Sequence, residues 1–212
     1  MSYSSKGRTL ILAIVGILLA VVIGVLAGNY LNTNDDQAQA VRDAGIIVLP
    51  KSREVPALRM ASTHADLQDT QALTGQWSLV YFGYTFCPDI CPTTLAELRQ
   101  LKNLLPDEAK NNLRVLMVSV DPHRDTTEQL KSYLHYFDPE FIGLTGDMPD
   151  IQTLSNALSI PFIPGDTRTA RYTVDHSGNL AIISPDGRQY GFIRAPLNVR
   201  KLAEQLPKIM AE

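Results

Sequence analysis

The chain contains two cysteines, Cys87 and Cys91, which lie four residues apart in the segment YFGYTFCPDICP. With three residues between them, their sulfur atoms can approach closely enough to form a disulfide or to share one metal ion. An apolar run precedes the pair and a helical pattern follows it, so we expect the pair at a helix N-terminus. The free N–H groups and partial positive charge there favour thiolate over thiol. We therefore expect redox or metal chemistry, with a structural disulfide that closes a small loop as the alternative.

Two thiolates leave a metal ion under-coordinated, so a further ligand would have to come from one of the four histidines. His64 lies in a polar stretch, His123 in a loop with helix-capping residues, and His135 near the end of an amphipathic helix. For these three we expect structural or solvent-exposed roles. His176 lies between the predicted strand Tyr172–Asp175 and a Ser-Gly turn. A loop histidine can reach a site at a neighbouring strand end, although spacing alone does not establish this.

The elements around these residues alternate between strands and helices. Apolar, β-rich runs predict strands, and leucines at helical spacing predict helices. The expected strands cover residues 77–84, 113–120, 141–145, 172–175, 180–184 and about 190–193, and the expected helices cover 92–105, 126–137, 150–160 and 198–210. A βαβα half followed by a ββα half implies a mixed sheet with helices on both faces, which is the order of a thioredoxin-like α/β fold.

The N-terminal region carries a strongly apolar run. Leu10–Gly28 has no polar side chain, and at helical rise its 19 residues span about 29 Å, close to the hydrocarbon thickness of a bilayer. Lys6 and Arg8 precede the run, and no acidic residue occurs before Asp35, so the N-terminus is expected in the cytoplasm. We expect an uncleaved transmembrane signal anchor over 10–28. A cleaved signal peptide is the alternative, although its apolar region usually has only about 7–15 residues. A buried helix is disfavoured by the absence of a polar face.

The residues that follow the apolar run are expected to form a tethered globular domain. The polar residues 29–43 are expected to form a linker between the anchor and a single domain over 44–212, with 1–9 as a short cytoplasmic N-terminus. The 212-residue chain is 45% hydrophobic, which favours a packed core. Removing Lys6 and Arg8 with the anchor changes the net charge from −3 to −5. We therefore expect no nucleic-acid partner.

Three segments of the chain resemble the Sco/SenC family of copper-binding assembly factors for cytochrome c oxidase. They read FGYTFCPDICPTTLAEL, VSVDPHRDT and VDHSGNLAIISPDG, and they occur in the family's order. The similarity covers most of the chain from about Trp77 to Leu206. The resemblance implies a membrane-anchored, thioredoxin-like domain in the bacterial periplasm or the mitochondrial intermembrane space. We favour a bacterial inner membrane, because no Arg/Ser-rich transit peptide precedes the apolar run.

By this resemblance Cys87, Cys91 and His176 are the copper ligands, and subunit II of cytochrome c oxidase receives the metal at its Cu-A site. Two soft thiolates and one imidazole suit Cu(I), whereas structural zinc would require a fourth ligand. Binding of Cu(II) and loading by an upstream periplasmic copper donor stay open. Asp89 and Asp175 are candidates for partner-facing or ligand-orienting groups, with solvated carboxylates as the alternative.

Two features depart from the family pattern. The β-hairpin that commonly precedes the first conserved strand is expected to be altered or short, because residues 57–74 contain no glycine. His123 stands in the DPxRDT loop where an acidic residue is usual. This difference weakens the resemblance at a peripheral surface and leaves the predicted copper site unaffected.

The main rival function is a membrane-anchored thiol–disulfide oxidoreductase. Cys87 and Cys91 would then be its redox-active residues, and His176 would be dispensable. As a copper chaperone the chain is expected to have no catalytic residues. A peroxidase is disfavoured, because by family resemblance it would need a threonine three residues before the reactive cysteine, where Tyr84 and Pro88 stand. A non-catalytic anchor or scaffold is the third class.

Overall fold

The computed structural model describes residues 5–169 and 171–211, and it describes their side chains except those of residues 5, 6, 8–11 and 25–34. The chain divides into two compact units, Met1–Ala40 and Val41–Glu212. Each unit is described separately below.

The described residues of the first unit lie within helix α1, which runs from Ser5 to Asp43. The polar residues 29–42, expected as a tether, are therefore helical. In the part of the chain that the structure describes, no helix is both long enough and apolar enough to cross a membrane. Residues 10, 11 and 25–28 of the expected span lie outside the described side chains. The transmembrane anchor over 10–28 stays a prediction.

The second unit is built on a seven-stranded mixed sheet in the order β1-β7-β6-β3-β4-β5-β2. Strands β3, β4 and β5 run parallel, whereas β6 and β7 continue the sheet antiparallel beyond β3, with β1 at the far edge. The strands are β1 Ile46–Glu54, β2 Ala61–Ser62, β3 Trp77–Gly83, β4 Leu113–Ser119, β5 Ile142–Thr145, β6 Leu180–Ile183 and β7 Arg188–Ile193. This arrangement confirms the predicted thioredoxin-like mixed sheet.

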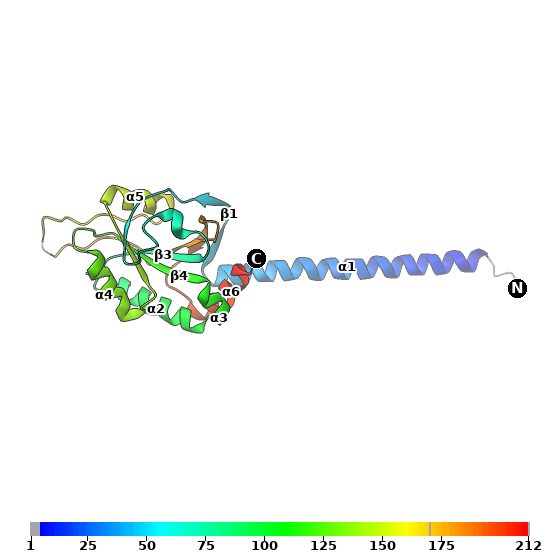
Figure 1. Ribbon diagram of the computed structural model, residues 1–212. Coiled ribbons are helices and arrows are strands. Elements are labelled where there is room, and N and C mark those ends of the chain that lie inside the picture. The colour runs from blue at the N-terminus through cyan, green and yellow to red at the C-terminus, as the bar shows by residue number, and fades with distance from the viewer. Residues whose placement is uncertain (1–4, 170, 212) are drawn as a thin grey trace. The chain divides into compact units, whose positions relative to one another are not determined.

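Helices flank the sheet on both sides (Figure 1). Helices α2 and α4 connect the parallel strands, and α2 also packs against α6, so these three helices lie on the same side of the sheet. Helix α5, which leads from β5 toward β6, lies on the opposite side. The helices of this unit are α2 Ile90–Leu104, α3 Asp107–Asn111, α4 Thr127–Phe137, α5 Met148–Ala157 and α6 Val199–Met210, with a 3₁₀ helix at Thr70–Leu73.

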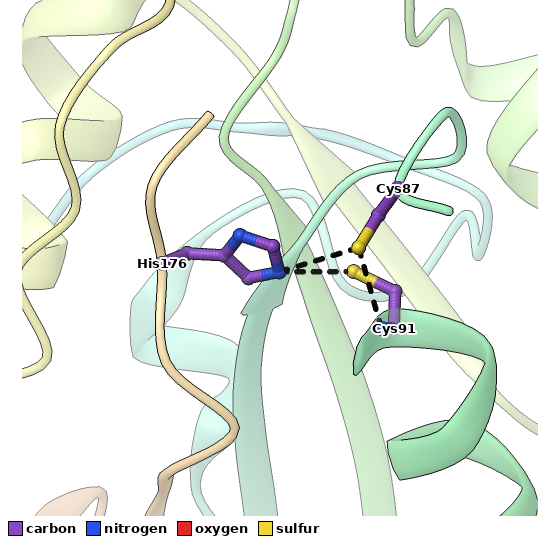
Figure 2. A group of neighbouring side chains, drawn as sticks. All are labelled: Cys87, Cys91 and His176. Carbon is purple, nitrogen blue, oxygen red and sulfur yellow. Dashed lines mark hydrogen bonds between the residues drawn. The ribbon is translucent and has the colours of Figure 1, made fainter. Parts of the chain in front are cut away.

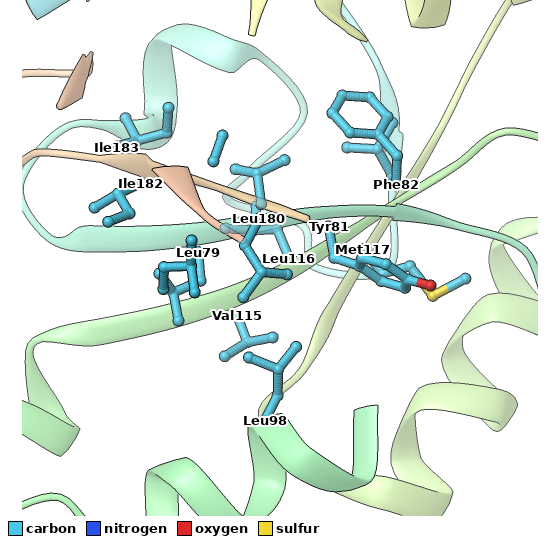
Figure 3. Close-up of a cluster of buried hydrophobic side chains, with 14 of the residues drawn as sticks. Leu79, Tyr81, Phe82, Leu98, Val115, Leu116, Met117, Leu180, Ile182 and Ile183 are labelled. Atoms are coloured by element: carbon cyan, nitrogen blue, oxygen red, sulfur yellow. The ribbon is translucent and has the colours of Figure 1, made fainter. Parts of the chain in front are cut away.

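The core lies around the central strand β3. All seven residues of β3 are buried, which is typical of a strand covered by side chains on both faces. In Figure 3, Leu79 and Tyr81 of β3 lie among apolar side chains of β4 and β6, and Leu98 of α2 lies close to Val115. The central strand therefore gives a rigid support to whatever follows its carboxyl end.

One predicted strand is wrong. Residues 172–175 form no strand, and a single bridge between Ile163 and Asp175 is the pairing found there among the described residues. The physical reason is that both edges of β6 are already occupied, one by β3 and the other by β7. The segment that leads to His176 is consequently a loop beside the sheet.

The region before β3 agrees with the expected short hairpin. Its two arms are joined by one bridge between Arg59 and Asp69, flanked by hydrogen bonds from Met60 N to Gln68 O and from Thr70 N to Leu58 O. The edge strand β1 was not predicted from the sequence. The carboxyl end of β3 and the loop before β6 are the two features that position the candidate site.

Candidate metal centre

The two cysteines lie at the carboxyl end of the central strand. Strand β3 ends at Gly83, the connecting loop carries Cys87, and Cys91 is the second residue of α2. Figure 2 shows both sulfur atoms turned toward the imidazole of His176, which comes from the loop before β6. The structure thus brings together the three residues that the resemblance implied.

The three ligand atoms form a compact group. One ligand atom from each of Cys87, Cys91 and His176 lies within 4.8 Å of the others. His176 Nε2 lies 3.1 Å from Cys91 Sγ and 3.8 Å from Cys87 Sγ. Both cysteines are free thiols. The described residues contain no other group of three or more cysteine, histidine or acidic side chains with this spacing.

Hydrogen bonds orient the histidine ring. His176 Nδ1 lies 2.8 Å from the carbonyl oxygen of Val174, and because a carbonyl can only accept, Nδ1 carries the proton. In the neutral imidazole, Nε2 is then the nitrogen that presents its lone pair, and this atom faces the sulfur atoms. The Tyr84 hydroxyl accepts a hydrogen bond from Val174 N at 3.3 Å, and the Tyr84 ring meets the imidazole edge-on. Strand-end residue Tyr84 thereby supports the histidine loop.

Cys91 lies on the buried side of the three-residue cluster. It has no solvent-exposed surface, and its sulfur accepts hydrogen bonds from the Tyr81 hydroxyl at 3.1 Å and from Tyr84 N at 3.5 Å. Gly83 leaves the space for this sulfur, since a Cβ atom there would lie 2.9 Å from Cys91 Sγ and 2.6 Å from a ring carbon of Tyr81. A side chain at residue 83 would displace the ligand.

The two thiols differ in acidity. Hydrogen bonding with Cys91 and with the backbone N–H groups of Asp89 and Cys91, together with the nearby His176, lowers the pKa of Cys87 to about 5. Burial, and then the interaction with Cys87, raises the pKa of Cys91. The backbone contribution includes Cys91 N at 3.4 Å from Cys87 Sγ, at the first turn of α2. The metal-free pair therefore holds one thiolate, on Cys87, and one thiol, on Cys91.

The other sequence candidates lie outside this group. His64, His123 and His135 are all exposed, and none belongs to the ligand cluster. His135 lies in the last turn of α4. Asp89 and Asp175 are also exposed, each beside a ligand-bearing segment. Both carboxylates are thus at the surface, and of these two residues the backbone N–H of Asp89 contributes to the Cys87 thiolate.

Several residues that shape the site were not predicted from the sequence. Tyr81 and Tyr84 were predicted only as residues of a buried strand. Their hydroxyl groups are the feature of the sequence that could have indicated polar contacts. The sequence left Asp125 or Thr126 as the helix cap, and the structure shows that it is Thr126, whose side chain accepts a hydrogen bond from Gln129 N. Asp125 instead accepts hydrogen bonds within the loop before Cys87, described below.

The donor set determines which metals fit. Thiolate sulfur and imidazole nitrogen are soft or borderline ligands, and Cu(I) tolerates the low coordination that three of them supply. A structural zinc ion would require a fourth ligand, and the described residues offer none in this cluster. The arrangement is therefore suited to a soft, low-coordinate metal ion, and its two sulfur atoms are also suited to thiol–disulfide exchange.

Comparisons with known proteins agree with this arrangement. A Stutzerimonas stutzeri protein, named as a candidate copper-binding protein, is 44% identical over 175 residues, which cover 82% of this chain and 86% of that protein. The structure of Bradyrhizobium japonicum ScoI with copper bound superposes with a TM-score of 0.65 at 28% identity, covering 73% of this chain and 98% of that one. Yeast Sco1 with copper bound gives a TM-score of 0.68 at 25% identity, covering 76% and 90% respectively.

The family model described as SCO1/SenC matches residues 50–211. This range contains the whole sheet except the first residues of β1, both cysteines and the histidine loop. With this match over most of its length, the chain belongs to the SCO1/SenC family.

Proposed function

We propose that this protein is a copper metallochaperone that binds copper through Cys87, Cys91 and His176 and delivers it to the Cu-A site of cytochrome c oxidase subunit II. The observation that carries the proposal is the convergence of the three ligand atoms within 4.8 Å, from segments separated by 85 residues of sequence. Two relatives of similar fold have structures with copper bound.

The electrostatics of the group support binding of Cu(I). Cys87 is a thiolate at neutral pH, so it can bind a cation without first losing a proton. Cys91 is protonated in the metal-free pair, and metal binding would release this proton. The site would therefore carry two thiolates and one neutral imidazole around a monovalent cation.

The burial of the ligands supports an order of release. Cys91 is fully buried, Cys87 is 8% exposed, and His176, on a loop, is only partly buried. An acceptor thiolate would approach from the outer side and replace His176 first, then Cys87, while Cys91 holds the copper to the end. Ligand exchange of this kind moves the metal without setting it free in solution.

We further propose that α1 anchors the protein in the bacterial inner membrane, with the second unit in the periplasm. The apolar run 10–28 and the basic residues before it support this orientation. The anchor would keep the metal centre at the membrane surface, where the Cu-A subunit is expected.

A second candidate function rests on the unequal acidity of the thiols. In a thiol–disulfide oxidoreductase, the Cys87 thiolate would attack a disulfide of the oxidase subunit and form a mixed disulfide, releasing one client thiolate. Cys91 would then lose its proton and attack Cys87. This step oxidises the cysteine pair and leaves two reduced client thiols. It requires no contribution from His176.

A transfer assay separates the two functions. The purified protein is loaded with Cu(I) and mixed with the soluble Cu-A domain of subunit II, supplied with its cysteines either reduced or as a disulfide. We expect copper transfer to the reduced domain from the wild type and a marked loss of transfer in His176→Ala. If the protein reduces the oxidised domain at the same rate with and without His176, and transfers no copper, the oxidoreductase is the correct function.

A further inference from the structure

The loop of residues 121–125 touches both segments that carry the metal ligands. It follows strand β4 and precedes α4, at the same edge of the sheet as the site. The loop is closed on itself by backbone hydrogen bonds from Arg124 N and Asp125 N to Asp121 O. Asp121 and Asp125 are each about 1% exposed, so the loop presents two buried carboxylates.

One of these carboxylates holds the cysteine loop. Asp125 accepts hydrogen bonds from the backbone N–H of Thr85 at 3.1 Å and from its hydroxyl at 2.6 Å. It also accepts one from the Ser119 hydroxyl at 2.7 Å, at the end of β4. Thr85 lies two residues before Cys87, so Asp125 fixes the start of the turn that presents the first sulfur.

The other carboxylate and its arginine hold the histidine loop. Asp121 accepts short hydrogen bonds from Arg124 Nε and from the Tyr172 hydroxyl. Arg124 Nη2 donates to the carbonyl oxygen of Tyr172 at 3.1 Å, and the guanidinium lies 3.7 Å from the centre of the Tyr172 ring. The guanidinium also lies 4.9 Å from the centre of the ring of Phe86, the neighbour of Cys87. Arg124 therefore lies between the two ligand-bearing segments.

The histidine segment has little regular backbone pairing, although Val174 within it is buried in the core. Residues 161–179 contain no helix or strand among the described residues, and the bridge at Asp175 and the bond from Val174 to Tyr84 are its main backbone ties near the site. Tyr172 lies four residues before His176. A fixed Tyr172 restricts how far the imidazole can move from the sulfur atoms.

We propose that Arg124, held by Asp121, is a positioning residue that keeps His176 over the cysteine pair, an inference that rests on the proposed copper-binding function. Arg124 contacts no ligand atom itself. Its closest contacts in the two segments are with the ring and carbonyl of Tyr172, so most of its contribution to copper affinity should depend on His176 being available as a ligand. Replacement of groups that orient a metal ligand typically costs about 10- to 100-fold in metal affinity.

A double-mutant cycle tests this dependence. The full-length protein in detergent is titrated with Cu(I) against a chromogenic chelator, as wild type, Arg124→Met, His176→Ala and the double variant. We expect Arg124→Met to weaken Cu(I) binding about tenfold or more. In the His176→Ala background, Arg124→Met should weaken Cu(I) binding less than about twofold, because the effects of two substitutions are not additive when one residue acts through the other. Equal losses in both backgrounds, or no loss in either, would overturn the proposal.

Two further variants serve as controls for the double-mutant cycle. Arg124→Lys keeps a cation beside Asp121 but lacks the planar guanidinium, with which Arg124 bonds Asp121 and the Tyr172 carbonyl from two separate nitrogens and lies over the Tyr172 ring. This variant should therefore also lose about tenfold in affinity. Wild-type affinity in Arg124→Lys would contradict the proposal even if Arg124→Met does not fold. Arg53→Met is the matched control, since Arg53 lies 5.5 Å from the Phe192 ring and bonds Gln189 on the β1 edge. Its affinity should stay at the wild-type value. If the wild type itself binds no copper, the proposed function fails, whereas a copper-binding wild type with an unaffected Arg124→Lys overturns only the role of Arg124.

Discussion

At the scale of single residues, the fold gives two identical side chains different chemistry. Cys87 lies in the loop just before α2, where the Cys91 thiol and backbone N–H groups at the start of the helix stabilise its negative charge. Cys91 lies behind it, without solvent contact, where burial opposes ionisation. A metal chaperone gains from this difference, because one sulfur can capture a metal ion from solution and the other can retain it.

The acidity of Cys87 predicts its reactivity in the reduced, metal-free protein. Its pKa of about 5 means that the thiolate is present above pH 5 and is lost as the pH falls through that value. The rate of alkylation by iodoacetamide should therefore level off above pH 6, whereas an ordinary thiol with a pKa of about 8.5 reacts faster up to pH 9. Cys87→Ser, which leaves only Cys91, should react slowly throughout. Mass spectrometry of the labelled sites measures both; a rate that still climbs steeply between pH 7 and 9 would contradict the assignment.

The close approach at Gly83 gives a second prediction. Gly83→Ala places a methyl group 2.6 Å from the rigid Tyr81 ring and 2.9 Å from Cys91 Sγ. We expect a loss of about 1–3 kcal/mol in the free energy of unfolding, together with weaker Cu(I) binding. Chemical denaturation and chelator competition measure the two effects. Gly146→Ala is the control, because its methyl group would meet Met60 only at ordinary contact distances of 3.8 Å or more. Equal stability of both variants would show that the site tolerates the added group.

At the scale of elements, the site depends on the contact between α2 and the sheet. Cys91 belongs to α2, and Leu98, two turns further along, is completely buried against the core (Figure 3). Helix α2 also packs against its neighbours α6 and α4 in the same helical layer. The position of the buried sulfur relative to β3 is therefore set by apolar packing along the helix.

Truncation of this contact should destabilise the domain. Leu98→Ala leaves a cavity in a fully packed region, and the expected loss in the free energy of unfolding is about 2–5 kcal/mol. Gln100→Ala, on the exposed side of the same helix, should change it by less than about 0.5 kcal/mol. Urea unfolding followed by circular dichroism provides the comparison. A loss below 1 kcal/mol in Leu98→Ala would mean that α2 is not held by this contact.

The sequence predicted most of these elements because their patterns are local. Continuous apolar runs identified β3 and β4, and leucine spacing identified α2 and α4. Strand β1 escaped prediction because its residues do not alternate in burial, and Ile47 and Val48 are both about 40% exposed. The false strand at 172–175 had a suitable composition, but whether a strand forms depends on a free sheet edge, which is a property of the whole topology.

The candidate site was predicted unevenly for the same reason. The cysteine spacing and the strand–helix junction are visible in the sequence, whereas His176 was assigned to the site on the basis of the family resemblance. The contacts of Arg124 with Tyr172 join residues 48 positions apart and leave no local pattern. Sequence reasoning therefore found the three residues that cluster in the structure and missed the residues packed around them.

At the scale of the whole molecule, the chain combines a compact metal-binding unit with a long N-terminal helix. If α1 is a membrane anchor, the full-length protein should sediment with bacterial membranes and resist extraction by alkaline carbonate. A fragment from Asp35 to Glu212, which retains the whole core of the second unit, should remain in the soluble periplasmic fraction when supplied with a cleavable signal peptide. Release of the full-length protein by carbonate would contradict the anchor without affecting the copper site.

The central claim, that three residues form one copper site, is tested most directly by Cu(I) titration of the reduced fragment against a chromogenic chelator. We predict one tight site per chain in the wild type. Binding should be lost or sharply weakened in Cys87→Ser, Cys91→Ser and His176→Ala, because each change removes one of three ligands clustered within 4.8 Å. Absent binding in the wild type, or unchanged affinity in His176→Ala, would contradict the copper-carrier account and leave the two cysteines as a thiol–disulfide centre.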